Sequence, residues 1–344
     1  MEQQDILSMT LPELQAAVQE LGEPKFRAKQ IFNWLHQKRV TDFSEMTTLS
    51  LPFRERLASD FCINRLKIAK RLASSVDDTV KYLYELPDGN YVETVCMQYH
   101  HGTSLCISTQ VGCRMGCRFC ASAIAGFVRN LTPAEMLLQI YETERAQNCK
   151  ISSLVLMGIG EPLDNFDNVL RFLQLLSDPN GYGMSLRHVT VSTCGVVPKI
   201  LELAEQRLGL TLSVSLHCPN DAGRSAIMPI NRSYPIDVLL DACQTYFEKT
   251  GRRVTFEYAV MEQVNSAKQD AAALAERLKG LHAHVNLIPI NPVKERNFHT
   301  LKKTVLQFQK TLERYGIPAT IRRTLGSDIE AACGQLRRDA IQQT

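Results

Sequence analysis

Strand-like and helix-like segments alternate from about residue 104 onward, and this alternation limits the fold more than any other feature of the chain. Short apolar runs are separated by longer segments with helical periodicity, such as the one that opens with Thr132, Pro133 and Glu135. Repeated strand–helix units build a parallel sheet that closes, or nearly closes, into a barrel. The strands are expected at 105–108, 153–157, 188–192, 210–216, 254–260 and 285–288, with a last one at 319–322.

The least ordinary residues of the chain follow these strands. A cysteine-rich loop comes after the first strand, and short segments of glycine, proline and polar residues come after four others. Glycine and proline also mark ordinary turns, so any one segment is a weak signal. Their shared location predicts a site, because barrel enzymes build their sites at the C-terminal ends of the strands. The segments are 113–120, 158–162, 193–195, 217–220 and 291–292.

Three cysteines lie within eight residues of the first loop, at Cys113, Cys117 and Cys120. A [4Fe-4S] cube normally takes one cysteine per iron, so three cysteines leave one iron open for another ligand. Structural zinc is the alternative, but it needs four ligands, usually from two separated pairs. The next cysteine, Cys149, lies at the far end of a predicted helix. The spacing therefore favours a cluster with an open iron.

The composition fits this interpretation. The chain has 344 residues, is 44% hydrophobic and contains eleven cysteines at irregular spacing. An odd number of cysteines without a signal peptide favours reduced thiols and metal chemistry over a disulfide framework. No apolar run approaches the ~18 residues of a membrane span, so we expect a soluble cytoplasmic protein without a membrane partner. The net charge of +3 neither requires nor excludes nucleic acid.

The first 62 residues are expected to form short helices. Thr10 and Glu13 make a capping box at the start of one. A second helix, at about 24–38, interleaves basic residues with Phe26, Phe32 and Trp34. That pattern suits phosphate contacts and base stacking, but an amphipathic helix that packs its aromatic residues inward looks the same. The second interpretation is favoured for this helix.

Residues 63–100 change to a period of two, and the turn at 87–90 predicts a β-hairpin. In the second strand Glu93 shares a face with Tyr91, Val95 and Met97. A carboxylate on an apolar face is unusual. From the pattern alone, the favoured interpretation is that Glu93 lies near the turn and is solvated.

The motifs together resemble one family. The cysteine loop, with Phe119 before its last cysteine, is similar to the signature of the radical S-adenosylmethionine (SAM) superfamily, in which the open iron binds SAM. The longer motifs resemble the RlmN/Cfr family of RNA adenine methyltransferases, in order and over almost the whole chain. They lie at 110–122, 157–165, 191–198, 214–220, 228–231 and 326–336.

This resemblance implies an α/β fold, with a partial (β/α)6 radical SAM barrel at 101–325. It also implies an N-terminal helical RNA-binding accessory domain at 1–62, a small β extension at 63–100 and a C-terminal catalytic-cysteine segment at 326–344. The implied substrate is an adenine of 23S ribosomal RNA near the peptidyl transferase centre, and in some members also the adenosine next to the anticodon of transfer RNA. A monomer is expected, with flavodoxin or ferredoxin as electron donor.

The chemistry of adenine methylation explains why the family needs a radical. Carbon 2 of adenine is electron-poor and cannot attack the methyl sulfonium of SAM, whereas a carbon radical can add to it. In the family, two SAM molecules are used per turnover. One methylates a protein cysteine, and the other is cleaved to a 5'-deoxyadenosyl radical that abstracts hydrogen from this S-methyl group. The resulting methylene radical joins the adenine and leaves a covalent protein–RNA intermediate.

By motif position, Cys333 would carry the methyl group and Cys106 would resolve the adduct through a transient disulfide with Cys333. Glu93 matches the family's proton acceptor. Cys113, Cys117 and Cys120 would hold the [4Fe-4S] cluster. The SAM contacts carried over are Gly160, Glu161, Ser192, Ser215, Leu216, His217 and Asn291.

Some residues have simpler interpretations. Read alone, His217 is a strand-end histidine hydrogen-bonded to the backbone. Cys243 lies on the apolar stripe of its predicted helix and is expected in the core. No role is assigned to Cys62, Cys96, Cys149, Cys194 or Cys218.

Two rivals remain open. Cfr-like methylation of carbon 8, which confers antibiotic resistance, uses the same catalytic residues. The stretch at 227–234 and the extended basic N-terminal segment favour carbon 2. A non-catalytic iron–sulfur or zinc RNA-binding module is the alternative of another class, and it leaves the SAM-like loop around Glu161 unexplained.

Overall fold

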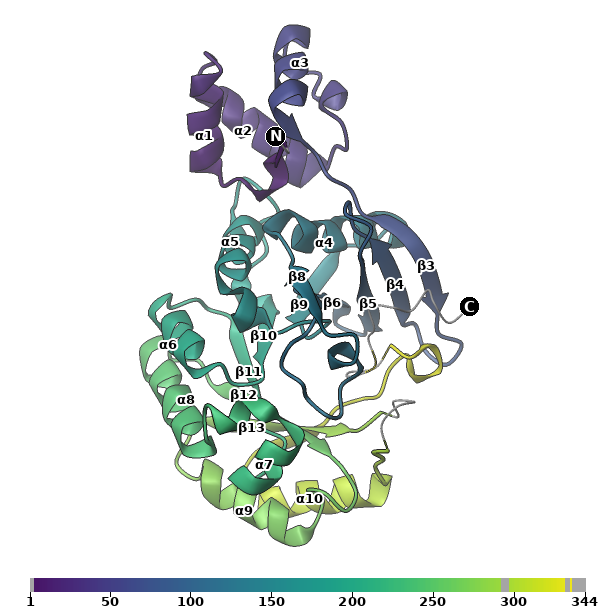
Figure 1. The fold of residues 1–344 in the computed structure, drawn as a ribbon, viewed down its shortest axis with the longest axis vertical. Coiled ribbons are helices and arrows are strands. Elements are labelled where there is room, and N and C mark those ends of the chain that lie inside the picture. The colour runs from purple at the N-terminus through teal and green to yellow at the C-terminus, as the bar shows by residue number, and fades with distance from the viewer. Residues whose placement is uncertain (1–2, 292–296, 332–334, 336–344) are drawn as a thin grey trace.

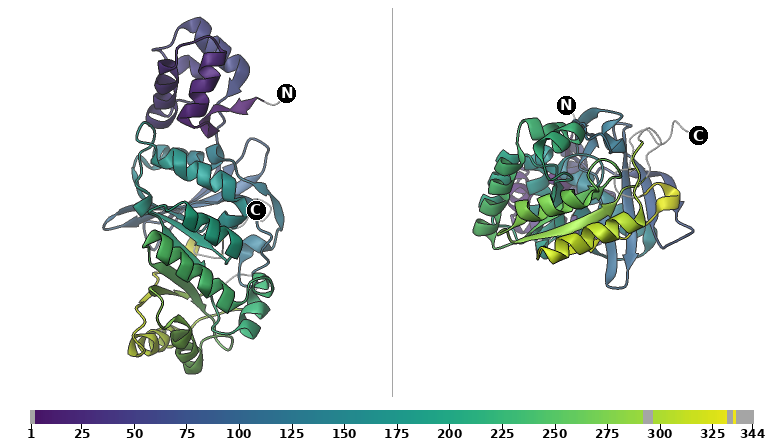
Figure 2. Two further views of the ribbon diagram at one scale, coloured as in Figure 1. Left: turned by 90° about the vertical axis from the view of Figure 1, so that its left-hand side faces the viewer. Right: turned by 90° about the horizontal axis from the view of Figure 1, so that it is seen from below.

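The computed structural model describes residues 3–291, 297–331 and 335, and Figure 1 shows its fold. A helical unit at the N-terminus lies beyond one end of the curved sheet (Figures 1 and 2). It contains α1 (Leu11–Glu20), α2 (Phe26–Asn33), a π-helical turn (Trp34–Lys38) and α3 (Leu51–Asp60). The parallel pair β1 (Gln4–Asp5) and β2 (Phe61–Cys62) joins its two ends.

The expected features of this unit are present in part. The capping box is confirmed, because the Thr10 backbone N–H donates to Glu13 Oε2 at 2.8 Å. Inward packing of the aromatic residues holds for Phe32, which is fully buried. It is wrong for Phe26, whose side chain is 58% exposed and lies beside the Arg27 guanidinium.

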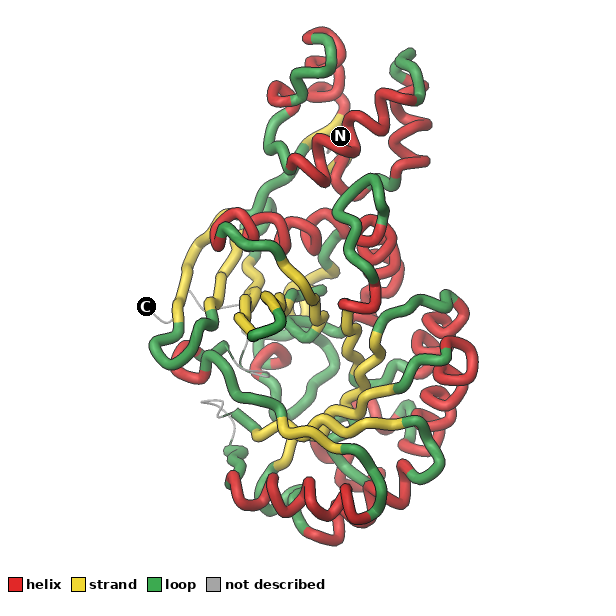
Figure 3. Tube along the Cα trace, turned by 180° about the vertical axis from the view of Figure 1, so that it is seen from behind, coloured by secondary structure: helices red, strands yellow, loops and turns green. Residues whose placement is uncertain are grey.

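Seven parallel strands form the barrel, as the alternation predicts. They pair in chain order as β6 (Gly102–Cys106), β9 (Ile151–Leu156), β10 (Val189–Thr193), β11 (Thr211–Ser215), β12 (Val254–Val260), β13 (Ala283–Pro289) and β14 (Ala319–Ile321). Figure 3 shows this sheet as a curved wall with helices outside it. The fold is therefore a partial α/β barrel, as the resemblance implied.

Helices connect the parallel strands and cover the outer face of the sheet (Figures 1 and 3). The residues of α4 at 133–144 are buried, since the N-terminal unit packs on the side of this helix that faces away from the sheet. His36 of that unit, for example, meets the hydroxyl of Tyr141 at 2.9 Å. These helices are α4 (Pro133–Gln147), α5 (Phe166–Ser177), α6 (Val197–Glu205), α8 (Ile236–Thr250), α9 (Lys268–Leu278) and α10 (Lys302–Arg314). The short helix α7 (Asp221–Ile227) follows β11 and packs on the cysteine loop instead.

Three antiparallel strands extend the sheet beyond β6. They are β3 (Lys67–Ala73), β4 (Val80–Glu85) and β5 (Tyr91–Tyr99), and β5 pairs with β6. The hairpin turn is confirmed, because the Leu86 N–H donates to the Asn90 carbonyl at 2.8 Å between β4 and β5. The sequence did not reveal that these strands continue the barrel sheet, which has ten strands in the part of the chain that the structure describes.

The chain returns to these strands near its C-terminus. Leu325 and Ala331 pack against Val95, Met97 and Cys106 of β5 and β6. The loop between β3 and β4 fixes this returning segment, since Asp77 accepts from the Gly326 N–H at 2.9 Å.

Among the described residues, no helix has the length and apolar character needed to cross a membrane.

Candidate active site

One cavity inside the barrel joins the loops that follow four neighbouring strands. The three cysteines of the first loop face it together with most of the predicted SAM contacts. Leu216 is fully buried and lines no part of this cavity, and Asn291 lines a second cavity next to it. The residues brought together in the first cavity are Cys113, Cys117, Cys120, Gly160, Glu161, Ser192, Ser215 and His217.

Two short strands support the cysteine loop, β7 (Gln110–Gly112) before it and β8 (Phe127–Asn130) after it. Gly112 has φ +77°, and a Cβ there would lie 1.7 Å from the Gly126 carbonyl oxygen. Only glycine fits this crossing of the two strands. The cysteines are therefore presented on a loop whose two ends are tied together.

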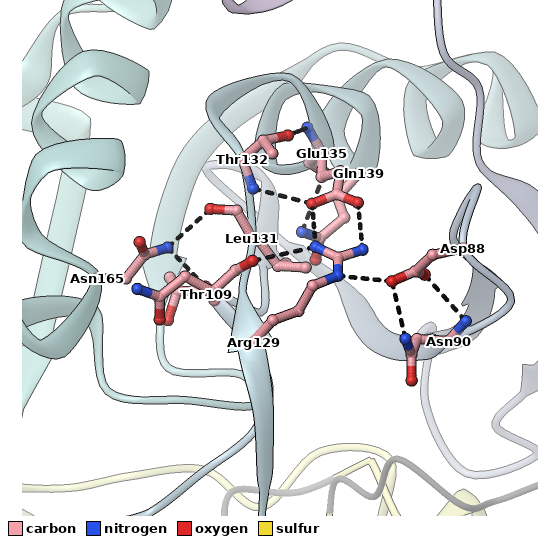
Figure 4. A network of polar contacts seen from close by, with 10 residues as sticks. Asp88, Asn90, Thr109, Arg129, Leu131, Thr132, Glu135, Gln139 and Asn165 are labelled. Atoms are coloured by element: carbon pink, nitrogen blue, oxygen red, sulfur yellow. Dashed lines mark hydrogen bonds and ion pairs between the residues drawn. The ribbon is translucent and has the colours of Figure 1, made fainter. Parts of the chain in front are cut away.

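Figure 4 shows a polar network at the end of β8. The Arg129 guanidinium donates to Glu135 at 2.7 and 2.8 Å and to Asp88 at 2.6 Å. Asn165 donates to the carbonyls of Thr109 and Leu131, both at 2.9 Å. These bonds join the cysteine loop to the start of α4 and to the β4–β5 turn, which fixes the path of the chain from the loop into α4.

The thiols of the loop suit a positively charged inorganic group. Burial raises the pKa of Cys113 to about 12 and that of Cys117 well above its ordinary value, and the neighbouring thiols raise both further. Metal ligation requires the thiolate, which an iron cluster stabilises by its positive charge. No three His, Cys, Asp or Glu side chains in the described ranges form a site for a single metal ion. Three sulfurs around one cavity fit a [4Fe-4S] cluster.

Glu161 is 4% exposed at the edge of this cavity. One carboxylate oxygen accepts from the Leu163 N–H at 3.0 Å and the other from the Cys194 N–H at 2.7 Å. Burial raises the pKa of Glu161, while these bonds lower it. The carboxylate is thus held in one orientation, and its remaining lone pairs can accept hydrogen bonds from an ammonium group.

Gly160, directly before Glu161, lets the backbone pass close to Gln110. Its φ is +111°, and a Cβ would lie 2.7 Å from Gln110 Cβ and 2.8 Å from Gln110 N. Gly160→Ala therefore strains the loop, at a cost of roughly 1 to 3 kcal/mol. We expect SAM affinity, measured by calorimetry on reconstituted protein, to fall by about tenfold or more. Gly209→Ala is the control, because the nearest atom to its Cβ would be 3.7 Å away. A folded Gly160→Ala variant with unchanged SAM affinity would contradict this role.

His217 combines a contact position with a structural role. It has φ +57°, and its Nδ1 accepts from the Ala259 N–H at 2.9 Å. Its ring meets Phe119 of the cysteine loop edge-on, with 4.8 Å between centroids. Burial lowers the pKa of His217 to about 3, so the ring is neutral at physiological pH. The strand-end interpretation is confirmed, and the residue also lines the cavity.

The second cavity contains Cys106, which is 5% exposed. Asn291, Leu325 and Ala331 also line it. Cys333 lies outside the described residues, two positions after Ala331. Met157, Ile288 and Arg322 line both cavities, so the two spaces are neighbours.

Glu93 is 1% exposed, so the expectation of a solvated carboxylate is wrong. Val95 and Met97, on the same face of β5, are covered by the segment that returns from 325 to 331. Glu93 forms an ion pair with Lys81 at 3.0 Å, and the same ammonium donates to the Glu330 carbonyl at 3.1 Å. Lys81 thus connects the carboxylate to the segment that leads to Cys333.

The sequence argument missed Glu257, which also lines the first cavity. It is 4% exposed and accepts from Ser213 Oγ at 2.6 Å and Asn286 Nδ2 at 2.8 Å. Burial raises its pKa, whereas Arg322 lowers it. The signal was available, because Glu257 is the one charged residue within the predicted strand 254–260.

Comparison with known proteins agrees with the geometry. Residues 4–63 match the model of the ribosomal RNA large subunit methyltransferase N-terminal domain, and residues 107–275 match the radical SAM superfamily. A probable dual-specificity RNA methyltransferase RlmN from Lachnoclostridium phytofermentans is 50% identical, over 99% of this chain and 96% of the relative. One from Clostridium novyi is 48% identical, over 98% and 99%.

A solved structure has the same fold over the whole chain. It is a radical SAM methyltransferase from Sphaerobacter thermophilus, with a TM-score of 0.93 and 40% identity, and the match covers 98% of this chain and 100% of that one. Similarity of this extent includes the N-terminal unit, the barrel and the antiparallel strands together.

Proposed function

Because the chain belongs to the RlmN family of radical SAM RNA methyltransferases, we propose that it methylates carbon 2 of adenine in 23S ribosomal RNA and in transfer RNA. The ribosomal target is an adenine near the peptidyl transferase centre, and the transfer RNA target is the adenosine next to the anticodon. The dual-specificity name of the relatives supports both substrates.

One observation carries the proposal: the cavity with the three loop cysteines adjoins the cavity with Cys106. Met157, Ile288 and Arg322 form their common wall. A radical made in the first cavity has only a short path to a methyl group held in the second. An RNA-binding module without catalysis has no need of this arrangement.

The first cavity would hold the cofactor and SAM. Cys113, Cys117 and Cys120 would ligate a [4Fe-4S] cluster, which when bound supplies the electron that cleaves SAM. Glu161 would accept the amino group of SAM, and Gly160 lets it approach the backbone. The other proposed SAM contacts are Ser192, Ser215, Leu216, His217 and Asn291.

The second cavity would hold the methyl carrier. Cys333 would receive the methyl group of one SAM, lose a hydrogen atom to the radical from the second SAM, and bond to adenine through the methylene carbon. Glu93 would take the proton from carbon 2 of the adduct, and the bound cluster, oxidised when SAM was cleaved, would take back the one electron that the adduct loses. The Cys106 thiolate would attack the sulfur of Cys333 and break its bond to the methylene carbon, which takes up a proton and leaves as the methyl group of the base while the two cysteines form a disulfide. Lys81 holds Glu93 in place through an ion pair, since its ammonium lies 3.0 Å from the carboxylate.

The remaining parts have supporting roles in this proposal. Residues 1–62 would bind RNA, residues 63–100 would complete the wall of the second cavity, residues 101–325 would form the catalytic barrel, and residues 326–344 would carry Cys333. A flavodoxin or ferredoxin would reduce the cluster, and the protein would act as a monomer.

The target atom separates this proposal from Cfr-like methylation of carbon 8. RNA treated with the reconstituted protein, SAM and a reductant is expected to yield 2-methyladenosine after digestion to nucleosides, with little or no 8-methyladenosine. Liquid chromatography and mass spectrometry distinguish the two isomers. A dominant 8-methyl product would reassign the target atom and leave the catalytic residues unchanged.

A further inference from the structure

Arg224 of α7 is fully buried next to the SAM cavity, although it does not line it. Its guanidinium donates to the carbonyls of Cys194 at 2.7 Å, Ser215 at 3.1 Å and Leu216 at 3.2 Å. Cys194 follows β10, and Ser215 and Leu216 lie at the end of β11. One side chain therefore ties together two loops that present SAM contacts.

A further bond links Arg224 to the motif at 228–231. Its Nη1 donates to Asn231 Oδ1 at 2.9 Å, and Asn231 Nδ2 donates to Asp221 Oδ1 at 2.9 Å. Asn231 is 2% exposed, so it acts as a fixed support for the guanidinium. Gly195 leaves room on the other side, because a Cβ there would lie 3.2 Å from Arg224 Nη2. The sequence motif thus serves to hold a buried arginine.

The charge of Arg224 is not matched by an adjacent carboxylate. Among the described residues, none lies within 4.0 Å of its guanidinium as an ion pair, and Asp221 reaches it only through Asn231. Burial lowers the pKa of Arg224, and the groups that oppose this effect include Cys194, Cys117, Cys218 and Asp221. A buried charge without a paired ion is costly, and such charges normally face a bound counter-ion.

The cluster site, at the loop on which α7 packs, would supply the anion that offsets this charge. The helix α7 packs on the cysteine loop, since the Arg118 N–H donates to the Ile227 carbonyl at 2.9 Å. The charge of Arg224 lowers the pKa of Cys117, against the larger effect of burial. Three thiolates give a bound [4Fe-4S] cluster a net negative charge, and reduction by one electron increases it. A fixed positive charge nearby favours the reduced form.

We propose that Arg224 is a positioning residue that holds the two SAM loops in place and supplies the positive charge that stabilises the reduced cluster. This role rests on the proposed function, because it requires the cluster at the three loop cysteines.

The test compares three variants of the anaerobically reconstituted full-length protein. Arg224→Gln removes the charge, Arg224→Lys keeps the charge without the planar fork, and Arg232→Gln removes an exposed arginine from the same region. Iron content, circular dichroism, the midpoint potential from a redox titration followed by electron paramagnetic resonance, and SAM affinity are measured for each.

Arg224→Gln is expected to bind iron and to lower the equilibrium constant for cluster reduction at least tenfold, a negative shift of about 59 mV for one electron. Its SAM affinity should also fall about tenfold. Arg224→Lys should keep the wild-type potential but lose SAM affinity, and Arg232→Gln should match the wild type in both. An unchanged potential in Arg224→Gln would overturn the electrostatic role.

If Arg224→Gln does not fold, wild-type SAM affinity in Arg224→Lys would still overturn the loop-holding role, and a shifted potential there would overturn the electrostatic role. Wild-type protein that binds no iron would refute the proposed function, and with it the charge role of Arg224. Failure confined to the Arg224 variants leaves the proposed function standing.

Discussion

Replacement of Cys113, Cys117 or Cys120 by alanine should remove both the iron and all methyltransferase activity. The loop offers three sulfurs, each for one iron, so the loss of one leaves two irons without a protein ligand. Cys194 also lines the cavity, but it lies outside the loop. Iron and sulfide content, visible absorption and SAM cleavage measure the effect.

Cys243→Ala is the matched control for these variants. Cys243 is 2% exposed on α8 and lines neither cavity, so its loss should affect packing and leave the cluster intact. The prediction fails if a triple alanine variant of the loop still methylates RNA. Loss of iron from Cys243→Ala to the same degree would show that the assay reports folding and not ligation.

Cys106→Ala should accumulate RNA covalently bound to the protein. If Cys333 carries the methylene carbon and Cys106 only resolves the adduct, the variant still forms the carbon–carbon bond but cannot break the link to sulfur. Cys333→Ala should form no adduct even where SAM cleavage persists, and the double variant should lose the adduct again. Nuclease digestion followed by mass spectrometry would locate the trimmed nucleotide on Cys333.

Cys96 provides the control for this pair. It lies on β5 beside Val95, the register partner of Cys106, and it is 6% exposed, but it packs in the main core and not in the cluster with Cys106. The Cys96→Ala variant should complete the methylation without accumulating a protein–RNA adduct. Normal turnover in Cys106→Ala, or an adduct that survives Cys333→Ala, would show that the roles of the two sulfurs are wrongly assigned.

The sequence was sufficient for the parallel strands and for the loops at their C-terminal ends. Apolar periodicity reports which side of an element is covered, and glycine and proline mark where it stops. The cavity of Cys113 and Glu161 follows directly, because carboxyl ends of parallel strands meet at one edge. The local sequence pattern was enough to predict a contact where the two partners lie near each other in the chain, or where both belong to the repeated strand–helix units.

The failures have a common physical cause. Glu93 was expected in solvent because it lies near the hairpin turn. The segment at 325–331, which packs on the same face of its strand, comes from the far end of the chain. Arg224 lies in a helix of seven residues between Gly223 and Ser225, and nothing in this local pattern predicts that it is buried. Burial of these charges depends on long-range packing that periodicity does not record.

The route of the carbon atom distinguishes this chemistry from ordinary SAM-dependent methylation. In the proposed mechanism, when the SAM methyl group carries three deuterium atoms, Cys333 would first receive the intact labelled methyl. The radical from the second SAM would then remove one deuterium atom, and the methylene that joins adenine would keep the other two. The third hydrogen of the product methyl group comes from elsewhere.

The decisive measurement is therefore the isotopic composition of the products made by the reconstituted protein from methyl-deuterated SAM and RNA. Mass spectrometry is expected to find 2-methyladenosine with two deuterium atoms in its methyl group and 5'-deoxyadenosine with one. A methylated adenosine that retains all three deuterium atoms, with unlabelled 5'-deoxyadenosine, would mean that the methyl group is transferred intact, and it would contradict a methylene intermediate on Cys333.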